Sequence, residues 1–247
     1  METAAYKTVG DIELAMGVYR PDEKKYPGKR PAIILFFGGS WNVGEIKQFT
    51  NQCNYLAERG MVCFTPEYRI NSKHGVTPFE CADDAADATE WVLAHAGEYS
   101  ADPDRIAIGG GSAGGHLAAC VTMMEGRYRE AGKIPKAMVL FNPALDPEKS
   151  KSIHRFEGRA AELSPLYFIR PGLPPAIIFN GDEDTLVSIE IPREFCEKMR
   201  QNGNFCELVE YPGQEHGFFN IRNGNDKYFL DTIQRTEVFL KEQGLLD

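Results

Sequence analysis

The chain has 247 residues, of which 43% are hydrophobic and 26% are charged, and this composition is typical of a folded globular protein. The formal net charge of −9, together with the lack of any run of lysine or arginine, argues against a protein that binds nucleic acid. No apolar stretch approaches the ~18 residues that a membrane-spanning helix needs, so we expect a soluble protein with no membrane partner.

The first residues of the chain lack the basic and apolar regions of a signal peptide. A cytoplasmic protein would begin in this way, and so would an exported protein whose signal peptide is absent. Two short antiparallel strands are expected on either side of Gly10–Asp11. Strand-like and helix-like segments then alternate, which predicts a mostly parallel, twisted sheet with helices on both faces. We interpret residues 1–247 as one α/β domain.

Six apolar segments with strand-like composition are the candidate parallel strands, and several are continuously apolar, as strands covered on both faces are. In a parallel sheet of this kind, the functional loops follow the carboxyl ends of the strands, so the chemistry is expected there. The segments are Ala32–Phe37, Met61–Thr65, Arg105–Ile108, Ala137–Phe141, Ala176–Phe179 and Cys206–Tyr211.

The first of these strands ends in the stretch LFFGGSWN, in which two glycines directly follow the apolar residues. A glycine pair at this point means that the backbone turns tightly or comes close to another group. The corresponding loop of lipases and esterases begins with the pattern H-G-G-G, but here Phe37 takes the place of the histidine. The stretch is therefore either an oxyanion loop with an unusual first residue or a simple turn.

Two helices carry clear end signals. The sequence TPFE at Thr77–Glu80 is a capping box with proline at the first helical position, and it predicts a helix that begins there. On this helix we expect Ala82 and its apolar neighbours to face the core. The acidic residues, Asp84 among them, are expected mostly on the opposite face. The last helix is expected from about Asp226 to Gln243.

The sequence RIAIGGGSAGGHLAA passes from a strand through glycines into a helix. Residues 110–114 fit the pattern G-x-S-x-G, a nucleophile elbow, and predict Ser112 as a nucleophile. The elbow needs small neighbours because its sharp turn holds the serine in a strained conformation above the sheet.

The same glycines also match the dinucleotide fingerprint G-x-G-x-x-G, which is the rival interpretation. That fingerprint needs an acidic residue about 20 positions further on, at the end of the next strand. Glu130 has about this spacing but precedes the next strand, so the elbow is favoured, and a plain glycine turn is a third alternative. We expect no cofactor and no metal ion, because Cys and His form no cluster with ligand spacing.

An elbow serine needs an acid and a histidine, each in a loop after a later strand. The loop GDEDTLV offers two acids, and we favour Asp184, further into the loop, over Asp182, which is placed to cap the turn. Only His216 among the five histidines lies in a loop just after the last strand, and His116 is expected to pack or to cap. A neutral imidazole can activate the serine, while the carboxylate fixes its tautomer and stabilises the imidazolium.

Six cysteines are too few for a disulfide scaffold in a chain of this length. Cys196 lies in a predicted helix, and Cys206 opens the next predicted strand. The strand returns antiparallel to the helix, and the rise per residue of the two elements would bring the two cysteines to a similar height. They could therefore meet in a disulfide, and two separate buried thiols are the alternative.

The segments FFGGSW, GGGSAGG, GDEDTLV and GQEHGFF together resemble the α/β-hydrolase superfamily. Within it, the chain resembles bacterial carboxylesterases close to acetyl-xylan and feruloyl esterases and to the hormone-sensitive-lipase group. The similarity covers nearly the whole chain, including EYRINSKHGVTPFE and AELSPL. It implies Ser112 as nucleophile, Asp184 as acid and His216 as base.

The resemblance also implies that the stretch after the first parallel strand is an oxyanion loop. The implied donors are the backbone N–H groups of Gly39 or Ser40, together with that of Ala113 after the nucleophile. Phe37 is expected to brace this loop by packing. Lipase-like relatives carry a long cap, but here only Asn142–Pro175 is a sizeable excursion, so we expect an open site with no large cap.

The predicted function is a serine carboxylester hydrolase that acts on short-acyl, acetyl-type esters, either small molecules or glycans. Trp41 and Tyr68, near strand ends, either offer flat surfaces for a sugar ring or pack into the core. The pattern GG-x-W also resembles kynurenine formamidases, so an amidase is the alternative enzyme, and a catalytically silent binding protein is the non-enzymatic one.

Overall fold

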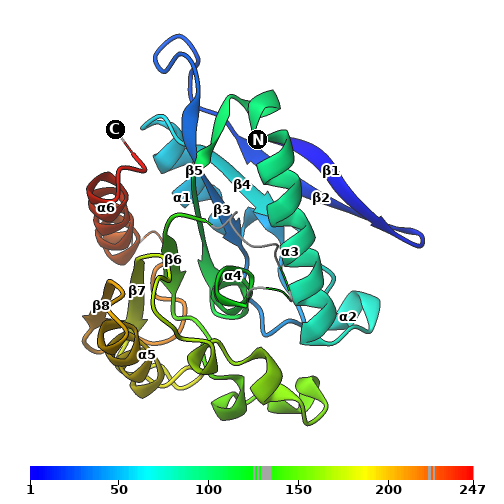
Figure 1. Ribbon diagram of the computed structural model, residues 1–247, viewed down its shortest axis with the longest axis vertical. Coiled ribbons are helices and arrows are strands. Elements are labelled where there is room, and N and C mark those ends of the chain that lie inside the picture. The colour runs from blue at the N-terminus through cyan, green and yellow to red at the C-terminus, as the bar shows by residue number, and fades with distance from the viewer. Residues whose placement is uncertain (125, 127, 129–134, 222–223, 225, 247) are drawn as a thin grey trace.

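A computed structural model describes residues 1–124, 126, 128, 135–221, 224 and 226–246. Within these residues, eight strands form one sheet in the order β1-β2-β4-β3-β5-β6-β7-β8 (Figure 1). The pairs β1–β2 and β2–β4 are antiparallel and the other neighbouring pairs are parallel, which confirms the predicted architecture. The strands are β1 (Glu2–Val9), β2 (Ile12–Tyr19), β3 (Arg30–Phe36), β4 (Val62–Pro66), β5 (Ala101–Gly111), β6 (Met138–Phe141), β7 (Ala176–Gly181) and β8 (Cys206–Tyr211).

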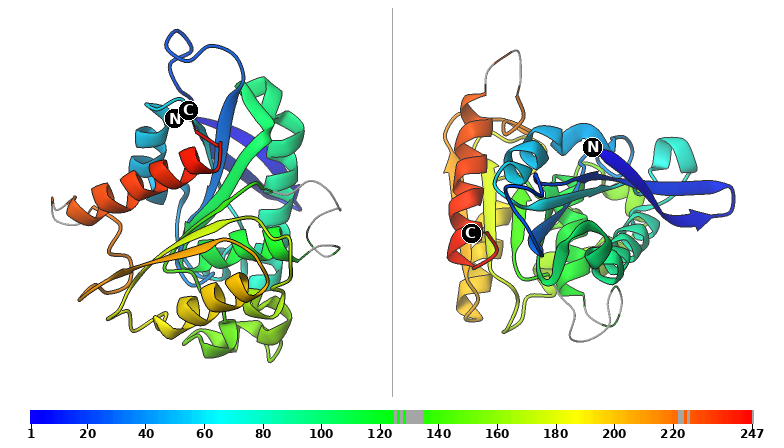
Figure 2. Two further views of the ribbon diagram at one scale, coloured as in Figure 1. Left: turned by 60° about the vertical axis from the view of Figure 1, so that its left-hand side comes forward. Right: turned by 90° about the horizontal axis from the view of Figure 1, so that it is seen from above.

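Helices cover both faces of the sheet (Figure 2). Buried side chains of α3, α4 and α5 belong to one hydrophobic cluster, and those of α1 and α6 belong to a second cluster on the opposite face. No helix among the described residues is long and apolar enough to cross a membrane. The helices are α1 (Thr50–Ala57), α2 (Asn71–His74), α3 (Pro78–His95), α4 (Ala113–Met123), α5 (Glu190–Gln201) and α6 (Lys227–Glu242).

The continuous apolar run of β3 follows from its position inside the sheet. Ile33 and Leu35 point into the cluster on the α1 and α6 side, whereas Ile34 and Phe36 point into the cluster on the α3 and α4 side. Successive side chains of a strand point to opposite faces, so a strand covered on both faces needs apolar residues at every position.

The predicted helix ends are confirmed. α3 begins at the capping box, in which the Thr77 N–H donates to Glu80 Oε2 at 2.9 Å and the Phe79 N–H donates to the Thr77 hydroxyl at 3.3 Å. α6 begins at Lys227 and ends at Glu242, each within one residue of the expected boundary. A local capping signal therefore sets the start of α3.

The expected exposure of Asp84 is wrong, because its side chain is fully buried. The Arg69 guanidinium donates to both carboxylate oxygens at 2.8 and 2.9 Å, and Lys7 Nζ lies 2.6 Å from Oδ1. These cations come from the loop after β4 and from β1. The periodicity of α3 predicted the apolar stripe but could not show that two distant basic residues cover this side of the helix.

Cys196 and Cys206 form a disulfide that joins α5 to β8, with a Cα–Cα distance of 5.2 Å. Of the two alternatives from the sequence, the structure therefore selects the covalent one. The other four cysteines are free and buried, and they are Cys53, Cys63, Cys81 and Cys120.

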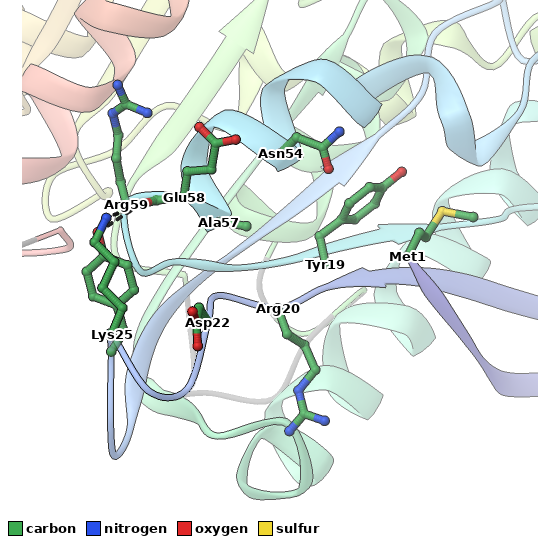
Figure 3. Close-up of a pocket in the computed structure, with 10 residues that line it drawn as sticks. Met1, Tyr19, Arg20, Asp22, Lys25, Asn54, Ala57, Glu58 and Arg59 are labelled. Atoms are coloured by element: carbon green, nitrogen blue, oxygen red, sulfur yellow. Dashed lines mark hydrogen bonds between the residues drawn. The ribbon is translucent and has the colours of Figure 1, made fainter.

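A cavity of about 720 Å³ opens beside the end of β2 and the start of the loop that follows it (Figure 3). Charged side chains of both signs line it, among them Arg20, Asp22 and Glu58. Tyr19, another lining residue, pairs with Cys63 near the beginning of β4. The cavity therefore lies toward the amino ends of the parallel strands, away from the edge at which functional loops are expected.

We expect the Asp84→Ala substitution to lower the free energy of unfolding by about 3 kcal/mol or more, because it leaves the partly buried Arg69 guanidinium without its anion and removes one of the two carboxylates that pair with Lys7. Asp83→Ala, which removes an exposed carboxylate from the same helix, is the matched control and should change stability by less than about 0.5 kcal/mol. Urea denaturation of the three proteins measures both effects. Equal losses for the two variants would contradict the role of the buried cluster.

Candidate active site

The loops that carry the candidate residues leave the carboxyl ends of strands that are neighbours in the sheet. The glycine loop follows β3, the serine turn follows β5, and the acid and histidine loops follow β7 and β8. The order β3-β5-β6-β7-β8 places these strand ends along one edge. The site is thus located where parallel α/β sheets form their functional crevice.

Ser112 lies on the turn between β5 and α4 with φ 53° and ψ −115°, a conformation that L-residues rarely adopt. A Cβ on Gly110 would lie 2.4 Å from the carbonyl oxygen of Phe36, and one on Gly114 would lie 2.1 Å from the same oxygen. Only glycine fits at these two positions, because β3 passes directly beside the turn. The Ser112 N–H donates to the carbonyl of Phe141 at 2.8 Å, which fixes the turn to β6.

His216 and Asp184 are paired, with 2.7 Å between His216 Nδ1 and Asp184 Oδ2. The Asp184 side chain is fully buried, and its other oxygen accepts the N–H groups of Leu186 and Val187 at 2.8 and 2.9 Å. These bonds fix the carboxylate with one oxygen toward the imidazole. Because an ionised carboxylate can only accept, Nδ1 carries the ring proton of neutral His216 and Nε2 is the acceptor.

Asp182 has a different partner. Its Oδ1 accepts the N–H of Gly213 at 2.7 Å, and its own N–H donates to the carbonyl of Tyr211 at 3.2 Å. Both bonds fasten the loop after β7 to the turn after β8. The structure therefore places Asp182 in the turn and brings Asp184, the favoured candidate, to His216.

Asn142 is a site residue that the sequence interpretation missed. It directly follows β6 with φ 37°, and its side chain is buried. Its Oδ1 accepts the N–H of Gly217 at 2.9 Å, so its amide nitrogen faces the ring of His216, 3.5 Å from Nε2. Asn is one of the few residues that tolerate positive φ, and its place after a buried strand was the signal available in the sequence.

The serine turn and the histidine loop are held against each other by two further contacts. The Ala144 N–H donates to the carbonyl of Ser112 at 3.3 Å, so the segment after β6 contacts both. A Cβ on Gly111 would lie 3.0 Å from the ring of Phe219, three residues after His216. The histidine loop therefore packs directly on the residue that precedes the serine.

The glycine loop lies against the serine turn from the other side. A Cβ on Gly38 would lie 2.7 Å from the carbonyl oxygen of Gly111 and 3.2 Å from Ser112 Cβ. The Gly38 N–H donates to Gln48 Oε1 at 2.6 Å, a brace that nothing in the sequence indicated. The two glycines of the opening pattern thus let one backbone approach another closely, as their pairing predicted.

We call residues 37–43 the oxyanion loop, after the role that the sequence predicts for them. Gly39 has φ 138°, and a Cβ there would lie 2.1 Å from the carbonyl oxygen of Val43. Ser40 follows with φ 55°. In the described part of the chain, the N–H groups of Gly39, Ser40 and Ala113 donate to no protein acceptor. These three backbone donors are therefore unpaired within the described residues, and the loop that carries two of them packs against the serine turn at Gly38.

The aromatic residues of this region are part of the core. Phe37 stacks on Tyr68 with ring centroids 4.1 Å apart, and the Tyr68 hydroxyl donates to the Phe37 carbonyl at 2.8 Å. Phe37 thus braces the loop by packing, as expected. Tyr68 and Trp41 are each only 2% exposed, so the interpretation of these rings as surfaces for a sugar is wrong and the packing alternative is correct.

His116 is buried behind the oxyanion loop. Its Nδ1 accepts the indole N–H of Trp41 at 3.2 Å, and its Nε2 donates to the carbonyl of Leu163 at 2.7 Å. Burial lowers the pKa of this imidazole to about 4, although the bond to the Leu163 carbonyl opposes the shift. His116 is therefore neutral at physiological pH and packed, as expected.

Between β6 and β7, the secondary structure of the described residues consists of short 3-10 turns. This agrees with the prediction of a site that has no large cap. The described residues also bring together no group of three or more His, Cys, Asp or Glu that could hold a metal ion. The four 3-10 turns are η3 (Pro147–Lys149), η4 (Ile153–Phe156), η5 (Ala160–Leu163) and η6 (Pro165–Tyr167).

This sheet, the strained serine between β5 and α4, and the buried Asp184–His216 pair define an α/β-hydrolase. The BD-FAE family model matches residues 16–153, more than half of the chain. The protein therefore belongs to the BD-FAE family, within the α/β-hydrolase superfamily. Sequence and structural relatives agree with this assignment.

The probable carboxylic ester hydrolase LipM of Mycobacterium tuberculosis is 30% identical over 82% of this chain and 53% of its own length. The probable isoprenylcysteine alpha-carbonyl methylesterase ICMEL1 of Arabidopsis thaliana is 26% identical over 88% and 52%. The chain thus spans about half the length of these curated relatives. Apo esterase 2 of Thermogutta terrifontis is 39% identical with a TM-score of 0.92, over 100% of this chain and 96% of that one. That esterase also has structures with propionate or butyrate bound and after phosphorylation by paraoxon.

The lowered pKa of His116 predicts that stability falls as the pH drops from about 6.5 to about 4. Between these pH values, His116 binds a proton in the unfolded chain but not in the folded protein. The resulting loss in the free energy of unfolding amounts to about 3 kcal/mol when the pH reaches 4. Urea denaturation at pH 7 and pH 4.5 measures the loss. His116→Gln, which does not titrate, should show a smaller loss over the same interval. Equal losses in both proteins would contradict the prediction.

Proposed function

We propose that this protein is a serine esterase that hydrolyses short-acyl carboxylic esters through an acyl-enzyme. In this proposal, Ser112 is the nucleophile, His216 the general base and Asp184 the acid. The observation that carries the proposal is the 2.7 Å pair between His216 and the buried Asp184, on loops that pack against the serine turn. No metal ion or cofactor has a role in this reaction.

The proposed reaction follows from the tautomer of His216. With its Nδ1–H held by Asp184, the ring offers Nε2 as the acceptor for the Ser112 proton while the serine oxygen attacks the ester carbonyl. The imidazolium then gives that proton to the departing alcohol, and the acyl group remains on the serine. Water attacks the acyl-enzyme in the same way and releases the acid. The buried carboxylate stabilises the imidazolium at each stage.

The carbonyl oxygen gains negative charge in both steps and needs hydrogen-bond donors. We assign this role to the N–H of Gly39 or Ser40 together with that of Ala113, because these groups have no protein acceptor among the described residues. Such donors are fixed before the reaction, and each is typically worth a factor of about 10²–10³ in kcat.

A short acyl chain is favoured by the absence of a cap over the described residues. Each methylene contributes only about 0.8 kcal/mol, and only where the site buries it. The propionate and butyrate bound to Thermogutta esterase 2 support the same size class. On the alcohol side, the burial of Trp41 and Tyr68 removes the structural argument for a sugar.

Ser112→Ala and His216→Ala are each expected to lower kcat by about 10⁴-fold or more, and the double variant should be little worse, because the residues act as a unit. Asp184→Asn should also be severe, since it fixes the wrong tautomer of the imidazole. Asp182→Asn, in the same loop, is the matched control and should retain most of the activity. A larger loss for Asp182→Asn than for Asp184→Asn would refute the choice of acid.

Paraoxon should inactivate the protein with release of one equivalent of p-nitrophenol and leave a phosphoryl group on Ser112. Intact-mass and peptide mass spectrometry measure the adduct, and Ser112→Ala serves as the unlabelled control. A protein that is not labelled would remain a hydrolase-like binding protein, and the enzyme proposal would be abandoned.

Among p-nitrophenyl esters, we expect the highest kcat/KM for acetate, propionate or butyrate, with a steep fall at octanoate and palmitate. Acetylated xylan and methyl ferulate, measured in the same series, test carbohydrate and feruloyl esters. A maximum at octanoate or longer would reject the open-site argument. Turnover of N-formylkynurenine without turnover of any ester would favour the amidase alternative.

A further inference from the structure

A fully buried histidine, His116, lies one turn after the nucleophile and has no role in the proposed reaction. Three parts of the protein meet at its ring. It belongs to α4, its Nδ1 faces the oxyanion loop at Trp41, and its Nε2 faces Leu163 in the η5 turn. Phe156 from the η4 turn packs edge-on against the same indole, with ring centroids 4.9 Å apart.

The chemistry of the partners fixes the state of this ring. The Leu163 carbonyl can only accept, so Nε2 carries the proton, and Nδ1 is left as the acceptor for the indole N–H of Trp41, which can only donate. Cys120 Sγ also lies 3.4 Å from Nε2. Both ring nitrogens of the neutral imidazole are therefore satisfied, and a protonated ring would have no acceptor to offer Trp41.

The oxyanion loop needs such a contact because its backbone is strained. Ser40 and Trp41 are consecutive left-handed residues with φ 55° and 57°, and neither is a glycine. Conformations of this kind persist only where the surroundings hold them. The Asn71 N–H donates to the Trp41 carbonyl at 2.9 Å, and His116 Nδ1 accepts the indole N–H at the other end of Trp41.

We propose that His116 is a positioning residue for the oxyanion loop. By accepting the Trp41 indole N–H, it keeps Trp41 and the adjacent Ser40 left-handed, and in this conformation the loop N–H groups are available to the substrate carbonyl. Loss of the acceptor leaves a buried indole donor unpaired, which favours relaxation of the loop. This inference rests on the proposed function for the assignment of the oxyanion donors.

Two variants separate the two bonds of the ring. His116→Asn keeps an acceptor near the position of Nδ1 and loses the bond to Leu163, whereas His116→Gln keeps a donor near the position of Nε2 and loses the bond to Trp41. We expect His116→Gln to lower kcat for p-nitrophenyl butyrate by about 10–100-fold, with KM changed less than about twofold. This loss is smaller than the loss in kcat expected when an oxyanion donor is removed completely. His116→Asn should stay within about threefold of the wild-type kcat.

Trp41→Phe keeps an aromatic ring and removes the N–H, so it should reproduce the loss of His116→Gln, and the double variant should be no worse. Paraoxon titration of active sites corrects every kcat for misfolded protein. The affinity for a trifluoromethyl ketone, whose adduct places an oxyanion in the site, should fall in parallel with kcat. Equal kcat losses for His116→Asn and His116→Gln, or no loss for His116→Gln, would overturn the proposal.

A second readout does not depend on activity. The chain has two tryptophans, so a ¹⁵N-indole spectrum contains two signals, and Trp41→Phe assigns them. The Trp41 indole N–H should exchange slowly with solvent in the wild type and in His116→Asn, and at least tenfold faster in His116→Gln. Unchanged exchange in His116→Gln would overturn the contact itself. An inactive wild type that paraoxon does not label would refute the proposed function, and the catalytic part of this inference with it.

Discussion

The site depends on one buried carboxylate whose two oxygens have different partners. One oxygen of Asp184 is held by two backbone N–H groups of its own loop, so the other can face only the imidazole of His216. Because the carboxylate accepts and cannot donate, it decides which ring nitrogen carries the proton. The Asn142 amide lies on the side of the ring that this choice leaves free, and the histidine loop packs through Phe219 on Gly111, the residue before the strained serine.

Much of this arrangement could be predicted from the sequence, because the signals are local. Alternating strand-like and helix-like segments predicted a mostly parallel sheet, and the capping box at Thr77–Glu80 predicted the start of α3. The small residues around Ser112 and the glycines of the oxyanion loop indicated close backbone contacts, and the structure contains these contacts. The preference for Asp184 over Asp182 as the acid followed from the positions of the two residues in the loop alone.

The rest could not be predicted, since it depends on which distant segments meet. Asp84 is buried because cations from β1 and from the loop after β4 reach it, and no periodicity of its helix records them. The side-chain oxygens of Gln48 and Asn142 each accept a backbone N–H from another loop. Trp41 was correctly placed near a strand end, but the direction of its ring depends on His116, 75 residues further along the chain.

The state of the cysteines has a practical consequence for spectroscopy. Two are joined in the disulfide, and the other four are buried, where the loss of hydration raises the pKa of the Cys53 and Cys81 thiols and keeps them protonated. Thiol-specific dyes react with exposed thiolates, so the native fold offers them poor targets. A cysteine introduced at exposed Val43 could therefore carry a fluorophore or spin label on the oxyanion loop without removal of the native cysteines.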